Sequence, residues 1–183
     1  DDCSTDRSLT KIVKLKKKFN NFNLKYFINK KNVGVAASSN FGILKSKGEY
    51  ITRLDSDDYI SKNFLNFMTF YLDEFKNNLG VCCDYYFVSN SGKKLNKINY
   101  TSKPISCAVM YRRKKLIRYG IYNKKLKHRE EEELRARLGK KYIIGYLNLP
   151  LYRYRMHLSN KTKSRDYKIK YRKILVDLKK VYA

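Results

Sequence analysis

One stretch of the chain joins an apolar run to three carboxylates: Tyr50-Ile51-Thr52-Arg53-Leu54-Asp55-Ser56-Asp57-Asp58-Tyr59. The β-branched and apolar residues at its start predict a short buried strand. Asp55, Asp57 and Asp58 would then lie at the carboxyl end of that strand, which is the edge where ligands bind in open α/β sheets. The stretch therefore predicts an α/β fold with a ligand site at this edge.

Three carboxylates within four residues repel one another unless a cation or hydrogen-bond donors lie among them. Carboxylates are hard ligands that suit Mg²⁺ or Mn²⁺ beside a phosphate group, so we expect a divalent cation here. The alternative is a solvated acidic turn that caps a helix beginning near Ser61. The stretch alone leaves both interpretations open.

The composition describes one basic globular domain. The 183 residues, of which 43% are hydrophobic, are enough to form a single core. Lys and Arg outnumber Asp and Glu by 42 to 16, and the resulting charge of +26 would attract nucleic acid or an anionic membrane. The abundant Lys, Asn, Tyr and Ile all have A/T-rich codons, so genome composition is an equally good explanation. Because the sequence contains no recognisable nucleic-acid-binding motif, we expect no specific nucleic acid partner.

The four cysteines, Cys3, Cys82, Cys83 and Cys107, show no C-x-x-C spacing, and no histidine cluster accompanies them. A zinc site is therefore not expected. Reduced, buried thiols are typical of a cytoplasmic protein. The sequence also shows neither a leader peptide nor an apolar window long enough to cross a membrane. We expect a cytoplasmic protein, with peripheral contact at the inner face of an anionic membrane as an open alternative.

Periodicity and capping residues predict helices over 6–19, 35–47, 61–78, a basic segment that Gly120 ends, 130–138 and 165–183. Strands are predicted over 24–28, the start of the 50–59 stretch, 81–88, 93–98, 105–111, 142–147 and 151–155. The early alternation of helix and strand predicts parallel pairing. The tight turn between 88 and 93 predicts an antiparallel hairpin, so the sheet should be mixed.

Several separated motifs together resemble family 2 glycosyltransferases, which have the GT-A fold and use a nucleotide-activated sugar donor. They match that family's DDxSxD loop, DXD motif, acceptor-side glycine loop, ED motif and YR-x-H segment. The stretches that carry the resemblance are Asp1-Asp2-Cys3-Ser4-Thr5-Asp6, Asn32-Val33-Gly34-Val35-Ala36 with Asn40 and Gly42, Gly48-Glu49-Tyr50-Ile51 with Asp55-Ser56-Asp57-Asp58, Gly120-Ile121-Tyr122, Glu130-Glu131-Glu132-Glu133-Leu134 with Arg137-Leu138, and Leu151-Tyr152-Arg153-Tyr154-Arg155-Met156-His157.

The resemblance implies an α/β fold of the GT-A (Rossmann-like) type, a three-layer sandwich with a mixed, mostly parallel central sheet. The glycosyltransferase domain is expected over 1–163, followed by a basic amphipathic helix over 164–183. The family has a strand and a helix before its DD loop, whereas this sequence starts at that loop. We therefore expect the first strand of the sheet to be missing and the natural N-terminus to lie upstream.

On the donor side, the resemblance assigns Asp57 and His157 to one bound Mn²⁺ or Mg²⁺. It places Asp55 and Asp58 against the donor ribose or the waters of the metal. Read alone, His157 would be a structural histidine.

Other residues are assigned to the nucleotide and to the acceptor. The resemblance places Asp1 and Asp2 beside the nucleobase and ribose, and Arg155 on the diphosphate. Glu131, where the family usually has Asp, would be the base that takes the acceptor proton in a single in-line displacement. Each assignment has a structural alternative. Asp1 and Asp2 would cap the first helix, Arg155 would be an ordinary surface arginine, and Glu131 would belong to a helix start that is enriched in acid.

The implied function is inverting transfer of a sugar from a nucleotide-sugar donor, expected to be a UDP-sugar, to a hydroxyl. The acceptor would be a glycan or a lipid-linked molecule in polysaccharide or cell-envelope synthesis. Two alternatives remain open at this stage. One is a non-catalytic or degenerate GT-A-like binding module, and the other is a basic nucleic-acid-binding domain.

Overall fold

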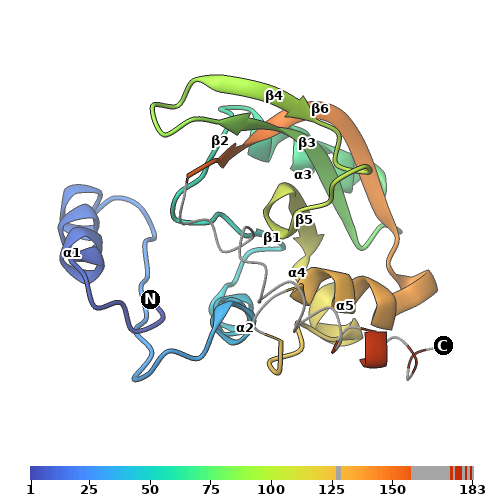
Figure 1. The fold of residues 1–183 in the computed structure, drawn as a ribbon, viewed down its shortest axis with the longest axis horizontal. Coiled ribbons are helices and arrows are strands. Elements are labelled where there is room, and N and C mark those ends of the chain that lie inside the picture. Colours follow the sequence, from blue (N-terminus) through green and yellow to red (C-terminus); the bar gives the residue numbers. More distant parts are fainter. Residues whose placement is uncertain (127–128, 158–173, 175, 179, 181, 183) are drawn as a thin grey trace.

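The computed structural model describes residues 1–126, 129–157, 174, 176–178, 180 and 182. Its centre is a six-stranded sheet with helices packed around it (Figure 1). The predicted helix at 164–183 falls largely outside the described residues, and so does its boundary with the domain over 1–163. Among the residues that are described, no helix is both long and apolar enough to span a bilayer.

The strands are β1 (Tyr50–Thr52), β2 (Tyr59–Ile60), β3 (Gly80–Val88), β4 (Lys94–Ile98), β5 (Val109–Arg112) and β6 (Ile144–Arg155). Their order is β1-β5-β3-β6-β2, and β4 also pairs with β3. Within the described part of the chain, β3 and β6 are parallel and the other pairs are antiparallel. The sheet is mixed, as predicted, but it is not mostly parallel.

The pairs that β3 makes with β4 and β5 are antiparallel because the chain returns along β3 after a tight turn. β4 pairs with one end of β3 and β5 with the other, so together they form an interrupted return strand. A short turn of 3-10 helix, η1 (Ser106–Ala108), separates the two. β1 and β3 do have the same direction, as their helical connection predicts. They are not neighbours, because β5 inserts between them and runs antiparallel to both.

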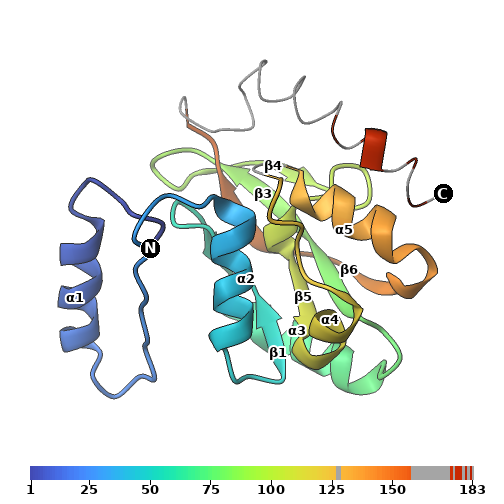
Figure 2. The ribbon, with the colours of Figure 1, turned by 90° about the horizontal axis from the view of Figure 1, so that it is seen from below.

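The helices are α1 (Ser8–Lys18), α2 (Val35–Lys45), α3 (Phe64–Glu74), α4 (Arg113–Tyr119) and α5 (Glu130–Leu138), with a 3-10 turn η2 (Gly139–Lys141) after α5. Adjacent residues of β5 contact different helices: Tyr111 donates a hydrogen bond to Glu131 of α5, and Arg112 donates to the carbonyl of Leu72 in α3. Successive strand residues point to opposite faces. The sheet therefore lies between α3 and α5, which gives the predicted three layers. Figure 2 shows α2, α4 and α5 on one side of it.

Helix α3 packs on the sheet through a stripe of Phe64, Met68 and Leu72, all fully buried. Their spacing of four residues places them on one helix face. Tyr71 of the same helix lies against Gly145 of β6, where a Cβ atom would come within 2.2 Å of the tyrosine ring. The glycine is thus required by the close approach of α3.

Two strand predictions are wrong. Residues 24–28 form no strand in the described structure. The carbonyl of Phe27 accepts a hydrogen bond from the amino group of Asp1 at 2.7 Å, and the Asn29 amide donates to the Asp1 carbonyl at 2.9 Å, so this segment lies beside the first residue and not beside a strand of the sheet. α1 buries no residue and stands apart from the sheet in Figure 1. The strands predicted at 142–147 and 151–155 are one continuous strand, β6, in which Pro150 lies at a register shift. Proline has no amide hydrogen to donate to a neighbouring strand, and it is tolerated at such an irregularity because the regular ladder of hydrogen bonds is interrupted there.

Candidate functional site

The acidic loop between β1 and β2 lies at the carboxyl end of β1, as predicted. Its backbone turns tightly, because the amide of Asp58 donates to the carbonyl of Asp55 at 3.1 Å. The Asp58 carboxylate accepts hydrogen bonds from the Tyr152 hydroxyl at 2.7 Å and from the Arg155 amide at 2.8 Å. Burial raises the pKa of Asp58 to about 6, against these two hydrogen bonds, which lower it. Strand β6 therefore fixes the orientation of Asp58.

Asp57 and His157 meet across 100 residues of sequence, with Oδ2 of the aspartate 2.8 Å from Nε2 of the histidine. Both side chains are partly exposed, at 40% and 24%. The guanidinium Nε of Arg155 donates to the main-chain oxygen of Asp57 at 2.7 Å. The structure thus brings together the two residues that the sequence assigned to one metal ion.

Asp55 is held on both of its carboxylate oxygens. Oδ1 forms an ion pair with Nε of Arg53 at 3.0 Å, and Oδ2 accepts a hydrogen bond from Sγ of Cys107 at 3.0 Å. Ligand atoms of Asp55, Asp58 and Cys107 all lie within 4.8 Å of one another. The sequence predicted only a buried reduced thiol at Cys107, and nothing near it in the chain indicated this contact.

The donor atoms of the acidic loop fit a divalent cation. Asp57 and His157 offer a carboxylate oxygen and an imidazole nitrogen that are close together and accessible from solvent. Asp55 and Asp58 offer further oxygens in the same loop, and these cluster with Sγ of Cys107. This set of mainly hard ligands suits Mn²⁺ or Mg²⁺, which needs few protein ligands when phosphates supply the others.

Glu131 lies at the start of α5 and is 5% exposed. Its Oε1 accepts hydrogen bonds from the hydroxyls of Tyr111, at 2.5 Å, and Tyr142, and its Oε2 accepts one from Tyr122 at 3.3 Å. Burial raises the pKa of Glu131 above its ordinary value, and the hydrogen bonds from Tyr111 and Tyr142 partly oppose that rise. Tyr122 belongs to the stretch that resembles the acceptor-side glycine loop, but Tyr111 and Tyr142 were not predicted, because they come from separate segments without a common motif.

Glu130, the residue before it, is 4% exposed and faces a different set of groups. Its Oε1 lies 2.8 Å from Nη1 of Arg53 and 3.5 Å from the hydroxyl of Ser106. Arg53 was not singled out from the sequence. The contact between Arg53 and Asp55 could have been predicted from the sequence. The two residues are two positions apart, and side chains with that spacing in an extended chain lie on the same face.

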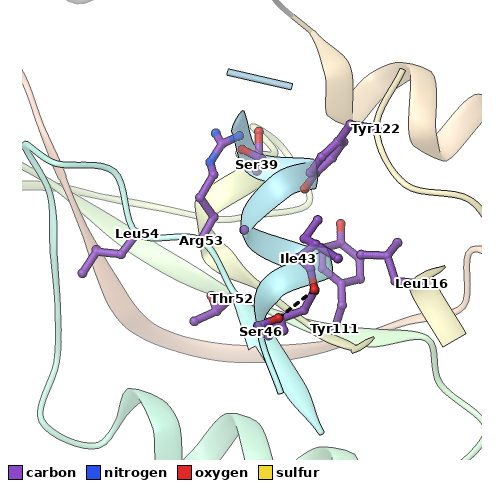
Figure 3. Close-up of a pocket in the computed structure, with 12 residues that line it drawn as sticks. Ser39, Ile43, Ser46, Thr52, Arg53, Leu54, Tyr111, Leu116 and Tyr122 are labelled. Atoms are coloured by element: carbon purple, nitrogen blue, oxygen red, sulfur yellow. Dashed lines mark hydrogen bonds between the residues drawn. The ribbon is translucent and has the colours of Figure 1, made fainter. Parts of the chain in front are cut away.

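A cavity of about 330 Å³ lies between α2 and the β1–β5 edge of the sheet (Figure 3). Tyr111 and Tyr122, which contact Glu131, form part of its wall, and Arg53 and Ser106, which contact Glu130, form another part. The remaining lining residues are Ser39, Gly42, Ile43, Ser46, Ile51, Thr52, Leu54 and Leu116. The two glutamates thus lie behind the groups that line this cavity.

Asp1 and Asp2 make their hydrogen bonds within the first 34 residues, as far as the described structure extends. Asp2 accepts from the amides of Val33 and Gly34, each at 2.8 Å, and from Asn29 at 3.0 Å. Burial alone would raise the pKa of Asp2, but these hydrogen bonds hold it below its usual value. In this structure Asp2 organises the loop before α2, and neither residue contacts the acidic loop.

Arg155 extends toward the β3–β4 turn. Its Nη1 donates to the carbonyls of Ser89, at 3.2 Å, and Asn90. Its guanidinium also lies over the ring of Tyr59, 5.7 Å from the centroid. Arg153 points elsewhere and lies over the ring of Tyr86. Arg155 therefore connects the acidic loop to the hairpin in the described structure.

Comparisons with known proteins identify the family of the chain and structures with a similar fold. Residues 1–140 match the model of the family described as glycosyl transferase family 2. The chain is 34% identical over 99 residues to chondroitin synthase of Escherichia coli, covering 54% of this chain and 14% of that protein. The chain thus spans about one seventh of that relative's length.

Two solved structures have a similar fold. One is S. aureus TarS (residues 1–349) in complex with UDP, with a TM-score of 0.71, 21% identity, and coverage of 97% of this chain and 54% of that one. The other is the mannosyltransferase PcManGT from Pyrobaculum calidifontis in complex with GDP-Man and Mn²⁺, with a TM-score of 0.71, 13% identity, and coverage of 97% and 52%. These likenesses confirm the predicted GT-A fold class. The family match over residues 1–140 establishes that the chain belongs to glycosyl transferase family 2.

Proposed function

We propose that the chain carries out inverting transfer of a sugar from a nucleotide-sugar donor to an acceptor hydroxyl. Membership of glycosyl transferase family 2 is the observation that carries this proposal. TarS is described in complex with UDP and with UDP-GlcNAc, and PcManGT with GDP-Man. A UDP-sugar is the donor that we expect first, because two of these three complexes contain uridine nucleotides.

Asp57 and His157 would hold a Mn²⁺ or Mg²⁺ ion, with Asp55 and Asp58 against its waters or the donor ribose. When bound, such an ion neutralises the charge that develops on the leaving nucleoside diphosphate. The Mn²⁺ in the PcManGT complex supports a divalent cation. The chain's own contribution is to fix two of these side chains: Arg53 and Cys107 hold Asp55, and Tyr152 and the Arg155 amide hold Asp58. Asp1, Asp2 and Arg155 remain candidates for the nucleobase, the ribose and the diphosphate.

Glu131 would take the proton of the acceptor hydroxyl. Its burial supports this role, because a raised pKa brings a carboxylate closer to the operating pH of a general base. In this proposal the acceptor reaches Glu131 from the cavity, past the hydroxyls of Tyr111 and Tyr122. The acceptor would be a glycan or a lipid-linked molecule, and the net charge of +26 is compatible with contact at an anionic membrane surface.

A screen of UDP-sugars for hydrolysis and transfer in the presence of Mn²⁺ tests this function. Replacing Glu131 by Gln keeps the shape of the side chain and removes the base, so kcat should fall by about 10²- to 10⁴-fold. The affinity for the donor should stay within about threefold, which is a change of less than 1 kcal/mol. Wild-type turnover in Glu131→Gln would show that Glu131 is not the base. If no sugar nucleotide is turned over, the non-catalytic alternative is favoured.

A further inference from the structure

Arg53 joins two acids that belong to different parts of the site. Its Nε lies 3.0 Å from Oδ1 of Asp55 in the acidic loop, and its Nη1 lies 2.8 Å from Oε1 of Glu130 at the start of α5. Its Nη2 lies 3.5 Å from Sγ of Cys107. One guanidinium group therefore contacts the loop, the helix and the 3-10 turn before β5. In Figure 3, Arg53 extends toward Ser39 of α2 at the side of the cavity.

Two residues of the 3-10 turn η1, Ser106 and Cys107, make further hydrogen bonds to the same two acids. Cys107 donates to the other oxygen of Asp55 at 3.0 Å, and Ser106 lies 3.5 Å from the same oxygen of Glu130. Asp55 is consequently fixed on both oxygens. Glu130 is 4% exposed, and a buried carboxylate needs such partners.

We propose that Arg53 is a positioning residue that sets the distance between the nucleotide-binding acids and the start of α5. This inference rests on the proposed function, since α5 also carries Glu131, the proposed base. Arg53 lines the cavity from which the acceptor is proposed to arrive, but the positioning role does not depend on contact with either substrate. Arg53 acts through Asp55 on one side and through Glu130 on the other. The guanidinium donates a hydrogen bond to Glu130 from Nη1 and forms an ion pair with Asp55 from Nε that lacks hydrogen-bond geometry. It thus holds the two carboxylates through different nitrogens, whereas lysine has a single ammonium group.

A displacement of about 1 Å in the reacting groups can reduce a rate by about 10²-fold. Arg53→Lys keeps the charge but loses the two-sided contact, so kcat should fall by about 10- to 100-fold. The KM for the donor should change by less than about threefold, because the acids themselves are retained. A residue with only a structural role would instead lower stability and leave the kcat of the folded protein unchanged.

Arg112→Lys is a matched control. Arg112 is also a largely buried arginine, with its side chain 12% exposed against 21% for Arg53. It joins β5 to the carbonyls of Leu72 and Asn78 on the α3 side, away from the acidic loop. Arg112→Lys should lower the melting temperature by a similar amount and leave kcat within about threefold of wild type.

A double-mutant cycle tests the connection without using catalysis. Urea unfolding is measured for Arg53→Gln, Asp55→Asn and Glu130→Gln, and for the two double variants that contain Arg53→Gln. Groups in direct contact give non-additive changes, whereas distant groups add. We expect non-additive shifts of the urea midpoint with both acids. Additive shifts with either acid would overturn the proposal, whether or not the protein turns over a donor.

The kinetic and unfolding measurements separate the two proposals. If wild type turns over no sugar nucleotide, the proposed function fails, and the catalytic effect assigned to Arg53 fails with it. If wild type is active but Arg53→Lys loses no more kcat than Arg112→Lys, only the positioning role is overturned. A selective loss of kcat in Arg53→Lys, together with coupling to both acids, supports it.

Discussion

The carboxylate of Glu131 is subject to opposing influences on its proton affinity. Burial raises its pKa, the hydrogen bonds from Tyr111 and Tyr142 lower it, and the charge of Glu130 adds to the rise. The ionised form is the one that can accept a proton from a hydroxyl. The tyrosine hydroxyls therefore determine over which pH range Glu131 is available as a base.

Replacing Tyr142 by Phe removes one donor to the ionised Glu131, so the glutamate stays protonated up to a higher pH. Because a base must be deprotonated to act, the acidic limb of kcat/KM should move to higher pH. A pH series of sugar transfer measures this limb. Tyr86→Phe is the control, since that ring lies on β3 against Lys94 and Arg153. A limb that stays in place in Tyr142→Phe would mean that another group controls it.

The residues of the acidic loop and His157 could be assigned from the sequence, because each occupies a motif position. Their meeting across 100 residues follows from the return of β6 beside β2. Arg53 was also within reach of the sequence, as the partner of Asp55 two positions later. Tyr111 and Tyr142 beside Glu131 were not, since isolated tyrosines in apolar segments are most often core residues.

At the scale of elements, the packing of α3 on β6 depends on a glycine. Replacing Gly145 by Ala would place a methyl group 2.2 Å from the Tyr71 ring, so the tyrosine side chain must move or helix and strand must separate. Overpacking of this kind costs about 1–3 kcal/mol of the free energy of unfolding. Urea denaturation of Gly145→Ala measures the loss.

Two further variants make that result specific to the contact. Gly42→Ala is the control, because nothing lies within 4 Å of its added Cβ and alanine favours the helix interior. Tyr71→Leu in the Gly145→Ala background removes the ring and should recover part of the lost stability. An equal loss with and without the tyrosine ring would show that the close approach is not the cause.

Elements with local signals were predicted best. α5 begins at Glu130 and ends before Gly139 as predicted, because acids favour a helix start and glycine a helix end. The hairpin of β3 and β4 was also correct. The insertion of β5 between β1 and β3 was not predictable, since β1 has only three residues and its partner lies far along the chain. The predicted strand at 24–28 failed because a strand depends on neighbours that local alternation does not reveal.

At the scale of the whole molecule, the net charge of +26 attracts any anionic ligand. This general attraction contributes to the association of a nucleotide and weakens as salt is added. UDP binding alone would therefore not distinguish a specific nucleotide-binding site from non-specific attraction to a basic surface. Removing one acid separates the two: general attraction then increases, whereas a site that needs the acid for its metal ion becomes weaker.

The most direct test is a calorimetric titration of UDP into wild type and Asp57→Asn, each with Mn²⁺ and with a chelator. We predict that wild type binds UDP only with Mn²⁺ and that Asp57→Asn binds at least about tenfold more weakly, a loss of about 1.4 kcal/mol. Glu49→Gln removes the same charge from a side chain that is 73% exposed and should bind like wild type. Equal binding of UDP without Mn²⁺, or binding to Asp57→Asn as tight as to wild type, would contradict a donor site that needs a metal ion held by Asp57.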